Sequence, residues 1–197
     1  GIYQLSSGIR VYCDMKTAGG GWQLLLTKNN PKSHFSGSVS PFLKDLNPNS
    51  PSTTQPYARN WEKSGLVAES GDEFLIMSKS NKDYVRFVTS KFCGWNEKQC
   101  GSAKSHLQIA NGQTYNSKGQ KLAGYVYFNG CALDGGCKNQ GVDGVAFGKY
   151  PSWANGPSGC YGGCWNGDGY FYWGTKRISS TTMTYWYRNK IPKECQS

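Results

Sequence analysis

Short runs of alternating apolar and polar residues dominate this chain, and no long segment repeats its apolar residues at helical spacing. The first part reads as strand, turn, strand, turn, strand, with the runs GIYQL, IRVYCDM and WQLLL separated at Ser6-Ser7-Gly8 and Gly19-Gly20-Gly21. Further along, DEFLIMSKS and KDYVRFVTSKF predict a hairpin that turns at 80–82. The run TTMTYWYR, 181–188, predicts a strand that crosses the core.

Three consecutive glycines, 19–21, separate two good strands beside Cys13. Glycine tolerates positive φ and lets another backbone come close. We therefore predict a sharp connection that packs tightly against its surroundings, with Trp22 filling the space next to it. A flexible linker is a poorer interpretation, because linkers do not normally join two apolar strands.

The remaining segments are less regular. Residues 29–60 carry five prolines and predict a long surface excursion, pinned by Phe35, Phe42 and Leu46. Asn111-Gly112 predicts a turn, and KLAGYVYFNGC, 121–131, another strand. Residues 134–169 are so rich in Gly, Asn and Pro that we expect almost all loop. Such long loops are usually functional, so the candidate site is placed within 134–173.

The eight cysteines indicate a disulfide framework and hence a secreted, extracellular protein. Local spacing favours three small loops, although cross-pairing is equally compatible with it. Zinc is a poorer interpretation, because the CxxxC motif has no second knuckle and the chain has two histidines. The cysteines are Cys13, Cys93, Cys100, Cys131, Cys137, Cys160, Cys164 and Cys195.

The formal net charge of +10 is unevenly distributed, since 169–193 contains five basic residues and no acidic one. Such asymmetry favours acidic partners, with an ordinary solvated face as the alternative. Disulfides argue against nucleic acid, and no apolar run reaches the length of roughly 18 residues that a membrane span needs. The first residues already read as strand, so we expect a mature protein or an excised domain.

Catalysis is not supported, because His34 and His106 lie far from the glycine-rich loop and no G-x-S-x-G motif is present. Sugars fit this inventory better: aromatic rings cover their C–H faces, and Asn, Asp or calcium bind their hydroxyls. Some of the aromatic residues will instead be core. The candidate ligand-binding residues are Trp153, Trp165, Asn166, Asp168, Tyr170, Tyr172 and Trp173.

The opening stretch, GIYQL followed by VYCDMKTAGGGWQLL, resembles the start of fibrinogen-related domains. The later GCALDGGC, 130–137, and YWGTKRISSTTMTYWYR, 172–188, are most similar to the intelectins, or X-type lectins. That resemblance implies a secreted, calcium-dependent lectin for microbial sugars, in which Tyr172 and Trp165 form walls of an aromatic box.

The resemblance also bears on calcium and on one disulfide. Asp134 occupies an acidic position of the family's cysteine-bounded segment, but Gly135 and Gly136 stand where the family has histidine. Calcium is therefore a candidate cofactor, with Asp134 and Asp143 as candidate ligands. The family pairs the cysteine equivalent to Cys13 with one upstream that this chain lacks, so Cys195 is its candidate partner.

Together these observations predict one α+β domain over 1–197, fibrinogen-like, with mostly short antiparallel strands and extensive disulfide-braced loops. We expect a non-enzymatic lectin for cell-surface or microbial glycans, and the basic excess favours an anionic sugar. The alternative is an extracellular protein-binding or adhesion module that uses the same loops. A second copy of the chain is a candidate partner.

Overall fold

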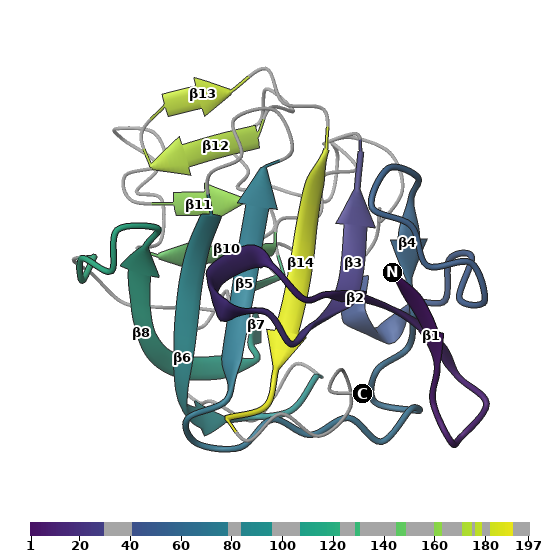
Figure 1. The fold of residues 1–197 in the computed structure, drawn as a ribbon. Helices are drawn as coiled ribbons and strands as arrows, with labels where there is room; N and C mark the ends of the chain where they lie inside the picture. The colour runs from purple at the N-terminus through teal and green to yellow at the C-terminus, as the bar shows by residue number, and fades with distance from the viewer. Residues whose placement is uncertain are drawn as a thin grey trace.

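Two antiparallel sheets make up the described part of the chain (Figure 1). The computed structural model describes residues 1–29, 41–78, 84–95, 107–122, 129–130, 145–148, 160–162, 171–174, 176–178 and 182–190. Within these residues the larger sheet has eight strands and the smaller sheet has six. Among them, no helix has the length and apolar character that a bilayer crossing requires.

The larger sheet has the order β1-β2-β3-β14-β5-β6-β8, with β4 also paired to β3. Its strands are β1 (Ile2–Gln4), β2 (Arg10–Asp14), β3 (Trp22–Lys28), β4 (Tyr57–Ala58), β5 (Glu73–Ser78), β6 (Tyr84–Phe92), β8 (Ala110–Asn116) and β14 (Met183–Arg188). The smaller sheet has the order β13-β12-β11-β10-β9-β7, and its strand β11 lies against β5. Its strands are β7 (Leu107–Gln108), β9 (Asn129–Gly130), β10 (Val145–Gly148), β11 (Cys160–Gly162), β12 (Phe171–Gly174) and β13 (Lys176–Ile178).

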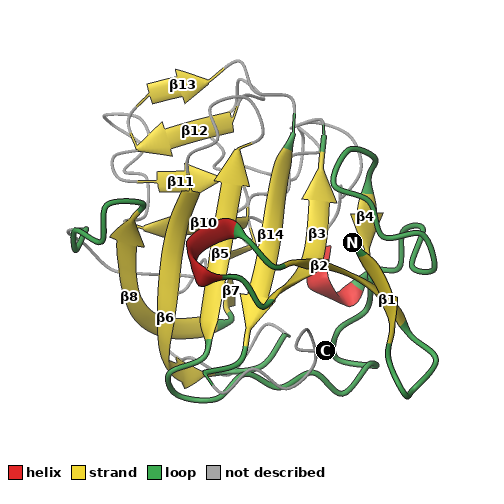
Figure 2. Cartoon of the chain, viewed as in Figure 1, coloured by secondary structure: helices red, strands yellow, loops and turns green. Residues whose placement is uncertain are grey.

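The expected α+β class is wrong, because the described residues form strands and no α-helix (Figure 2). Their helical elements are two single 3₁₀ turns, η1 (Thr17–Gly19) and η2 (Pro41–Leu43). The physical reason lies in the sequence itself: period-two alternation recurs along the chain, and helical spacing of apolar residues does not. The chain is therefore an antiparallel β protein over its described length.

The prediction that 134–169 is almost all loop is also wrong, because β10 and β11 lie inside it. These strands have four and three residues. Alternation cannot be recognised over so few positions, and their glycines disguise them further. The segment thus contains two strands of the smaller sheet, joined by connections that lie outside the described residues.

Strand β14 is the centre of the larger sheet and was correctly predicted to cross the core. It pairs with β3 on one side and with β5 on the other, so residues more than 100 positions apart in sequence become neighbours. Every residue of β14 from Met183 to Tyr187 is buried, as is every residue of β3. Both faces of the central strands are therefore covered.

Aromatic side chains form the core against one face of this sheet. Trp95 contacts Phe42, Phe74 and Phe92, with ring centroids 5.2, 6.2 and 5.2 Å apart. The indole N–H groups are also used: Trp61 Nε1 donates to the Leu25 carbonyl at 2.9 Å. Buried indoles need such partners because an unpaired buried donor is costly. The proline-rich excursion thus contributes Phe42 to the core, as expected, and Phe35 lies outside the described residues.

The hairpin predicted over 72–92 is confirmed as β5 and β6, which pair from Glu73 and Val88 to Met77 and Tyr84. The turn expected at Asn111-Gly112 is wrong, because both residues lie inside the continuous strand β8. A Cβ on Gly112 would lie 2.1 Å from the Val88 carbonyl oxygen, beside a register shift in β6. This glycine therefore permits two strands to approach closely. In the sequence, a glycine with this role looks the same as a glycine in a turn.

The triple glycine lies in the connection from β2 to β3, and the predicted tight packing is confirmed. Gly19, Gly20 and Gly21 all have positive φ, between 74° and 92°. A Cβ on Gly20 would lie 2.4 Å from the Met15 carbonyl oxygen, inside the same connection. Trp22 is fully buried beside it and donates its indole N–H to the Thr17 carbonyl at 2.8 Å.

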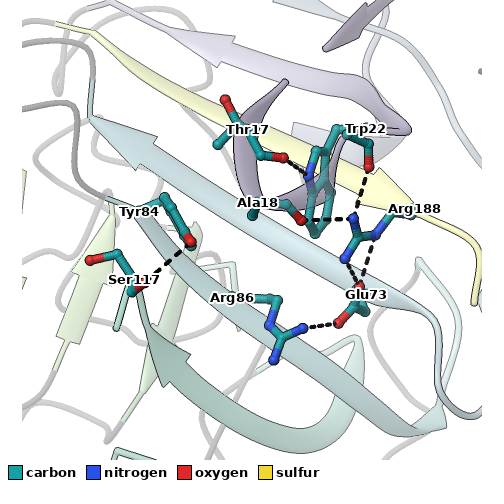
Figure 3. Close-up of polar contacts among 9 residues, drawn as sticks. Thr17, Ala18, Trp22, Glu73, Tyr84, Arg86, Ser117 and Arg188 are labelled. Carbon is teal, nitrogen blue, oxygen red and sulfur yellow. Dashed lines mark hydrogen bonds and ion pairs between the residues drawn. The ribbon is translucent and has the colours of Figure 1, made fainter. Parts of the chain in front are cut away.

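Arg188, at the end of β14, fixes this connection to the sheet (Figure 3). Its Nη1 donates to the carbonyls of Ala18 at 3.0 Å and Gly20 at 2.8 Å. Its Nε and Nη2 both donate to Oε2 of Glu73, the former at 2.8 Å. The guanidinium also lies 4.1 Å from the centroid of the Trp22 ring, a cation–π distance. The guanidinium of this basic residue therefore joins the β2–β3 connection to strand β5.

We predict that Gly20→Ala destabilises the fold far more than Gly65→Ala. Both glycines have φ +77°, which an alanine adopts only at a cost, and Gly20 also has ψ −167°, a combination that is essentially restricted to glycine. A Cβ at Gly65 meets nothing within 4 Å, whereas at Gly20 it meets backbone. Urea unfolding should show a loss for Gly20→Ala at least ~1.5 kcal/mol larger. Equal losses would show that the packing at Gly20 is unimportant.

Asp14 caps the same connection from its other end. Its Oδ1 accepts from the backbone N–H of Lys16 at 2.8 Å and of Thr17 at 3.0 Å, and its Oδ2 accepts from the Thr17 hydroxyl at 2.6 Å. Burial acts to raise the pKa of this carboxyl, but the hydrogen bonds from Thr17 and Lys16 outweigh it and lower the pKa below 3.8. The ionised carboxylate is thus stabilised by folding.

This lowered pKa predicts an acid dependence that Asp14→Asn should remove. A depressed folded-state pKa adds stability above the unfolded value, and that stability is lost as the pH falls from 3.8 through the folded-state pKa. The wild type should therefore exceed Asp14→Asn in unfolding free energy at neutral pH, by about 1 kcal/mol, with the gap closing in acid. A gap that stays constant with pH would contradict this assignment.

Candidate functional site

The predicted site residues lie mainly on connections between strands of the smaller sheet. Trp153, Trp165, Asn166, Asp168, Tyr170, Asp134 and Asp143 all lie outside the described residues. Tyr172 and Trp173 belong to β12, whose backbone and pairing are described. The described strands show at which end of the sheet each of these connections begins and ends.

One end of the smaller sheet receives two of the three candidate-bearing connections. Gly130 at the end of β9 pairs with Val145 at the start of β10, so 131–144 leaves and re-enters at this end. Gly162 at the end of β11 pairs with Tyr172 near the start of β12, so 163–170 does the same. Because Ala146 pairs with Gly162, both connections lie at the same end, which we call the acidic-aromatic end.

The two connections that begin and end at the acidic-aromatic end contain most of the predicted site residues in sequence. The connection 131–144 carries Asp134 and Asp143, the two candidate calcium ligands. The connection 163–170 carries Trp165, Asn166, Asp168 and Tyr170. Sequence gave no reason to join these two segments, which are separated by the whole of β10 and β11.

Trp153 belongs to the opposite end of the sheet. Its connection, 149–159, leaves after Gly148 and returns at Cys160, which pair with each other. In an antiparallel meander successive connections alternate between the two ends of the sheet. Trp153 is thus attached at the other end from Trp165, and the strand pairing does not bring these two candidates together.

Tyr172 and Trp173 occupy opposite faces of the smaller sheet, because consecutive residues of a strand alternate. Tyr172 is in register with Gly162 on one side and Arg177 on the other. Trp173 is in register with Tyr161 and Lys176, and Tyr161 also pairs with Phe147. The register therefore places Phe147, Tyr161 and Trp173 in one row, and Ala146, Gly162, Tyr172 and Arg177 in the neighbouring row.

Arg177 lies in the basic segment 169–193, but the sequence did not identify it as a candidate site residue. Its direct pairing with Tyr172 places a cationic residue beside the candidate stacking position. In the sequence, the strand-like run FYWG is followed closely by the short alternating run KRI. If these two runs are assumed to form a hairpin, Arg177 can be placed beside Tyr172. Neither run is long enough to make that assumption secure from sequence alone.

The cysteines support the disulfide interpretation where they are described. Cys13 and Cys93 are both disulfide-bonded, and the described residues include no free cysteine. Cys13 is buried in β2, next to Val11. Cys160 lies in β11, and Cys100, Cys131, Cys137, Cys164 and Cys195 lie outside the described residues. The pairing of Cys13 with Cys195 therefore stays a prediction.

The described side chains contain no group of His, Cys, Asp and Glu that could hold a metal ion. The candidate calcium ligands are not among those side chains, so the calcium prediction is neither supported nor contradicted. Comparison with known proteins adds no further assignment. No family model matches the chain, and no curated protein matches it.

Proposed function

We propose that this protein is an extracellular carbohydrate-binding protein whose binding surface lies at the acidic-aromatic end of the smaller sheet. The strand pairing supports the proposal, since 131–144 and 163–170 both begin and end at this end of the sheet. Ring faces, amide and carboxylate groups on adjacent connections are what an amphipathic sugar requires. The disulfides of Cys13 and Cys93 support an oxidising compartment.

The proposed ligand is an anionic glycan, because Arg177 is paired with Tyr172 next to this end. Guanidinium groups bind carboxylates and sulfates through paired hydrogen bonds. The face that carries both residues also carries Ala146, Gly162 and Gly174, which lack bulky side chains. Calcium, held by Asp134 and Asp143, is the proposed cofactor.

We predict that Trp165→Ala and Tyr172→Ala each weaken glycan binding about tenfold, which corresponds to ~1.4 kcal/mol of lost ring contact. Trp153→Ala is the matched control and should bind like the wild type, because its connection leaves the opposite end of the sheet. A glycan array with and without a chelator measures both effects, and calcium should restore binding lost to the chelator. Circular dichroism verifies that each variant is folded.

Two outcomes would overturn this proposal. Loss of binding in Trp153→Ala together with retention in Trp165→Ala would exclude the acidic-aromatic end. If no glycan on the array is bound, and a purified extracellular protein binds through the same residues, the protein is the adhesion module instead.

We also predict that Arg177→Gln lowers affinity for acidic glycans about threefold and weakens its salt dependence, while neutral glycans are unaffected. The control is Lys176→Gln, which removes a charge of the same sign from the neighbouring position on the opposite face. Titration calorimetry at low and at physiological salt compares the two variants. Equal effects of both substitutions would mean that only overall charge matters.

A further inference from the structure

A hollow of about 550 Å³ lies between the β1–β2 hairpin and the segment 61–67. Strand β3 contributes Gln23 to its wall, and Asn189, which directly follows β14, contributes a second carboxamide. The hollow is separate from the acidic-aromatic end, because its described lining includes no residue of the smaller sheet. Its volume falls within the usual range for small-ligand sites, roughly 300–1,000 Å³.

Gln23 is a buried polar side chain whose carboxamide takes part in none of the described hydrogen bonds. The residue is 4% exposed, and its backbone is paired with Cys13 of β2 on one side and Tyr187 of β14 on the other. Buried carboxamides are nearly always hydrogen-bonded, because an unpartnered one loses its contacts with water and gains nothing in return. The Gln23 carboxamide is therefore open to a group from outside the chain, and so is that of the partly buried Asn189.

The described lining of this hollow carries no charged side chain. A charged group that enters such a place gives up its hydration without meeting an opposite charge. In a chain with a formal net charge of +10, an uncharged lining also provides no attraction for an anion beyond that of the whole molecule. The hollow therefore favours an uncharged ligand, in contrast to the position of Arg177.

Aliphatic side chains face each other across the hollow. On the hairpin side, Leu5 and Ile9 are partly buried against Val11. On the other side, Leu66 packs partly buried against the main core, and the neighbouring Val67 is 65% exposed. An aliphatic group of a ligand can remove this apolar surface from water.

The described lining lacks the ring face that a sugar would stack on. Trp61 is its one aromatic residue, and it is 2% exposed. Its indole N–H also donates to the Leu25 carbonyl, so neither the face nor the edge of this ring is free for a ligand. The hollow therefore suits a different ligand class from the acidic-aromatic end.

We propose that this hollow binds an uncharged peptide segment, whose aliphatic side chain packs between Leu5 and Leu66 and whose backbone amide pairs with the Gln23 carboxamide. A carboxamide offers an N–H donor and a C=O acceptor, and so does a peptide group, so the two can form two hydrogen bonds with each other. Such a segment matches the absence of charge in the described lining, the aliphatic walls and the unpartnered amide. The proposal does not depend on the carbohydrate-binding function.

The test is a saturation-transfer NMR titration of the full chain with N-acetyl-L-leucine N′-methylamide, which carries an isobutyl group between two amides. We expect this diamide to bind, and N-acetyl-L-leucine, which has a carboxylate instead of the second amide, to bind at least about fivefold more weakly. Gln23→Met keeps the length of the side chain and removes both of its hydrogen-bonding atoms. This variant should bind the diamide about tenfold more weakly than the wild type. Its urea midpoint should not fall, because the buried group that it removes has no described partner.

Gln113→Met is the matched control. Gln113 lies in β8, outside the hollow, and its Nε2 donates to the carbonyls of Thr114 and Leu122 at 3.0 Å each. The control should therefore lower the urea midpoint and leave binding of the diamide unchanged. Val67→Ser probes the hollow at an exposed position that the fold should tolerate, and should weaken binding about threefold.

No transfer to the diamide would overturn the peptide site, as would diamide binding that Gln23→Met leaves unchanged. A fall in urea midpoint for Gln23→Met as large as that for Gln113→Met would also overturn it, because the Gln23 carboxamide would then have a structural role. Transfer to methyl β-glucopyranoside that depends on Gln23, without transfer to the diamide, would assign the hollow to a sugar. None of these results affects glycan-array binding that depends on Trp165, so the proposed function stands or falls separately.

Discussion

The pairing of β14 between β3 and β5 is the interaction on which the larger sheet depends. Without β14 these two strands would present unpaired edges to each other, and the aromatic core would lose Tyr185 and Tyr187. The strand also ends on Arg188, whose guanidinium joins Glu73 of β5 to the carbonyls of the β2–β3 connection. One short segment thus supplies the ladder, the core packing and the polar attachment of the amino-terminal hairpin.

The two sheets differ in the length and burial of their strands. The larger sheet buries its central strands on both faces, and its middle strand β14 is paired with segments distant in sequence. The smaller sheet has strands of two to four residues joined by long connections that carry the candidate aromatic and acidic residues. Short strands cannot supply much burial, so disulfides and contact with β5 are suitable ways to stabilise such a sheet. The proposed binding surface therefore lies where pairing is minimal.

The long strands could be predicted from the sequence. The prediction failed where one residue type serves two different structural purposes. The sequence pattern located β5, β6 and β14 because each is six residues or longer and rich in apolar and aromatic residues. Gly112 was misread as a turn, since close strand approach and positive φ both select glycine. Sheet order was beyond reach, because the pairing of β14 with β3 joins residues about 160 positions apart. That 131–144 and 163–170 share one end of the smaller sheet follows from the pairing of β9 to β12, whose strands are too short to recognise in the sequence.

The position of β14 in the chain has a consequence for how the protein is made. A ribosome synthesises the middle strand of the larger sheet after both of its neighbours, so β3 and β5 must wait with open edges. Loop closure over this span is slow, and in the meantime the unpaired edges of β3 and β5 can pair with other nascent chains. Chains that stop short of Met183 would therefore tend to aggregate rather than remain as partly folded monomers.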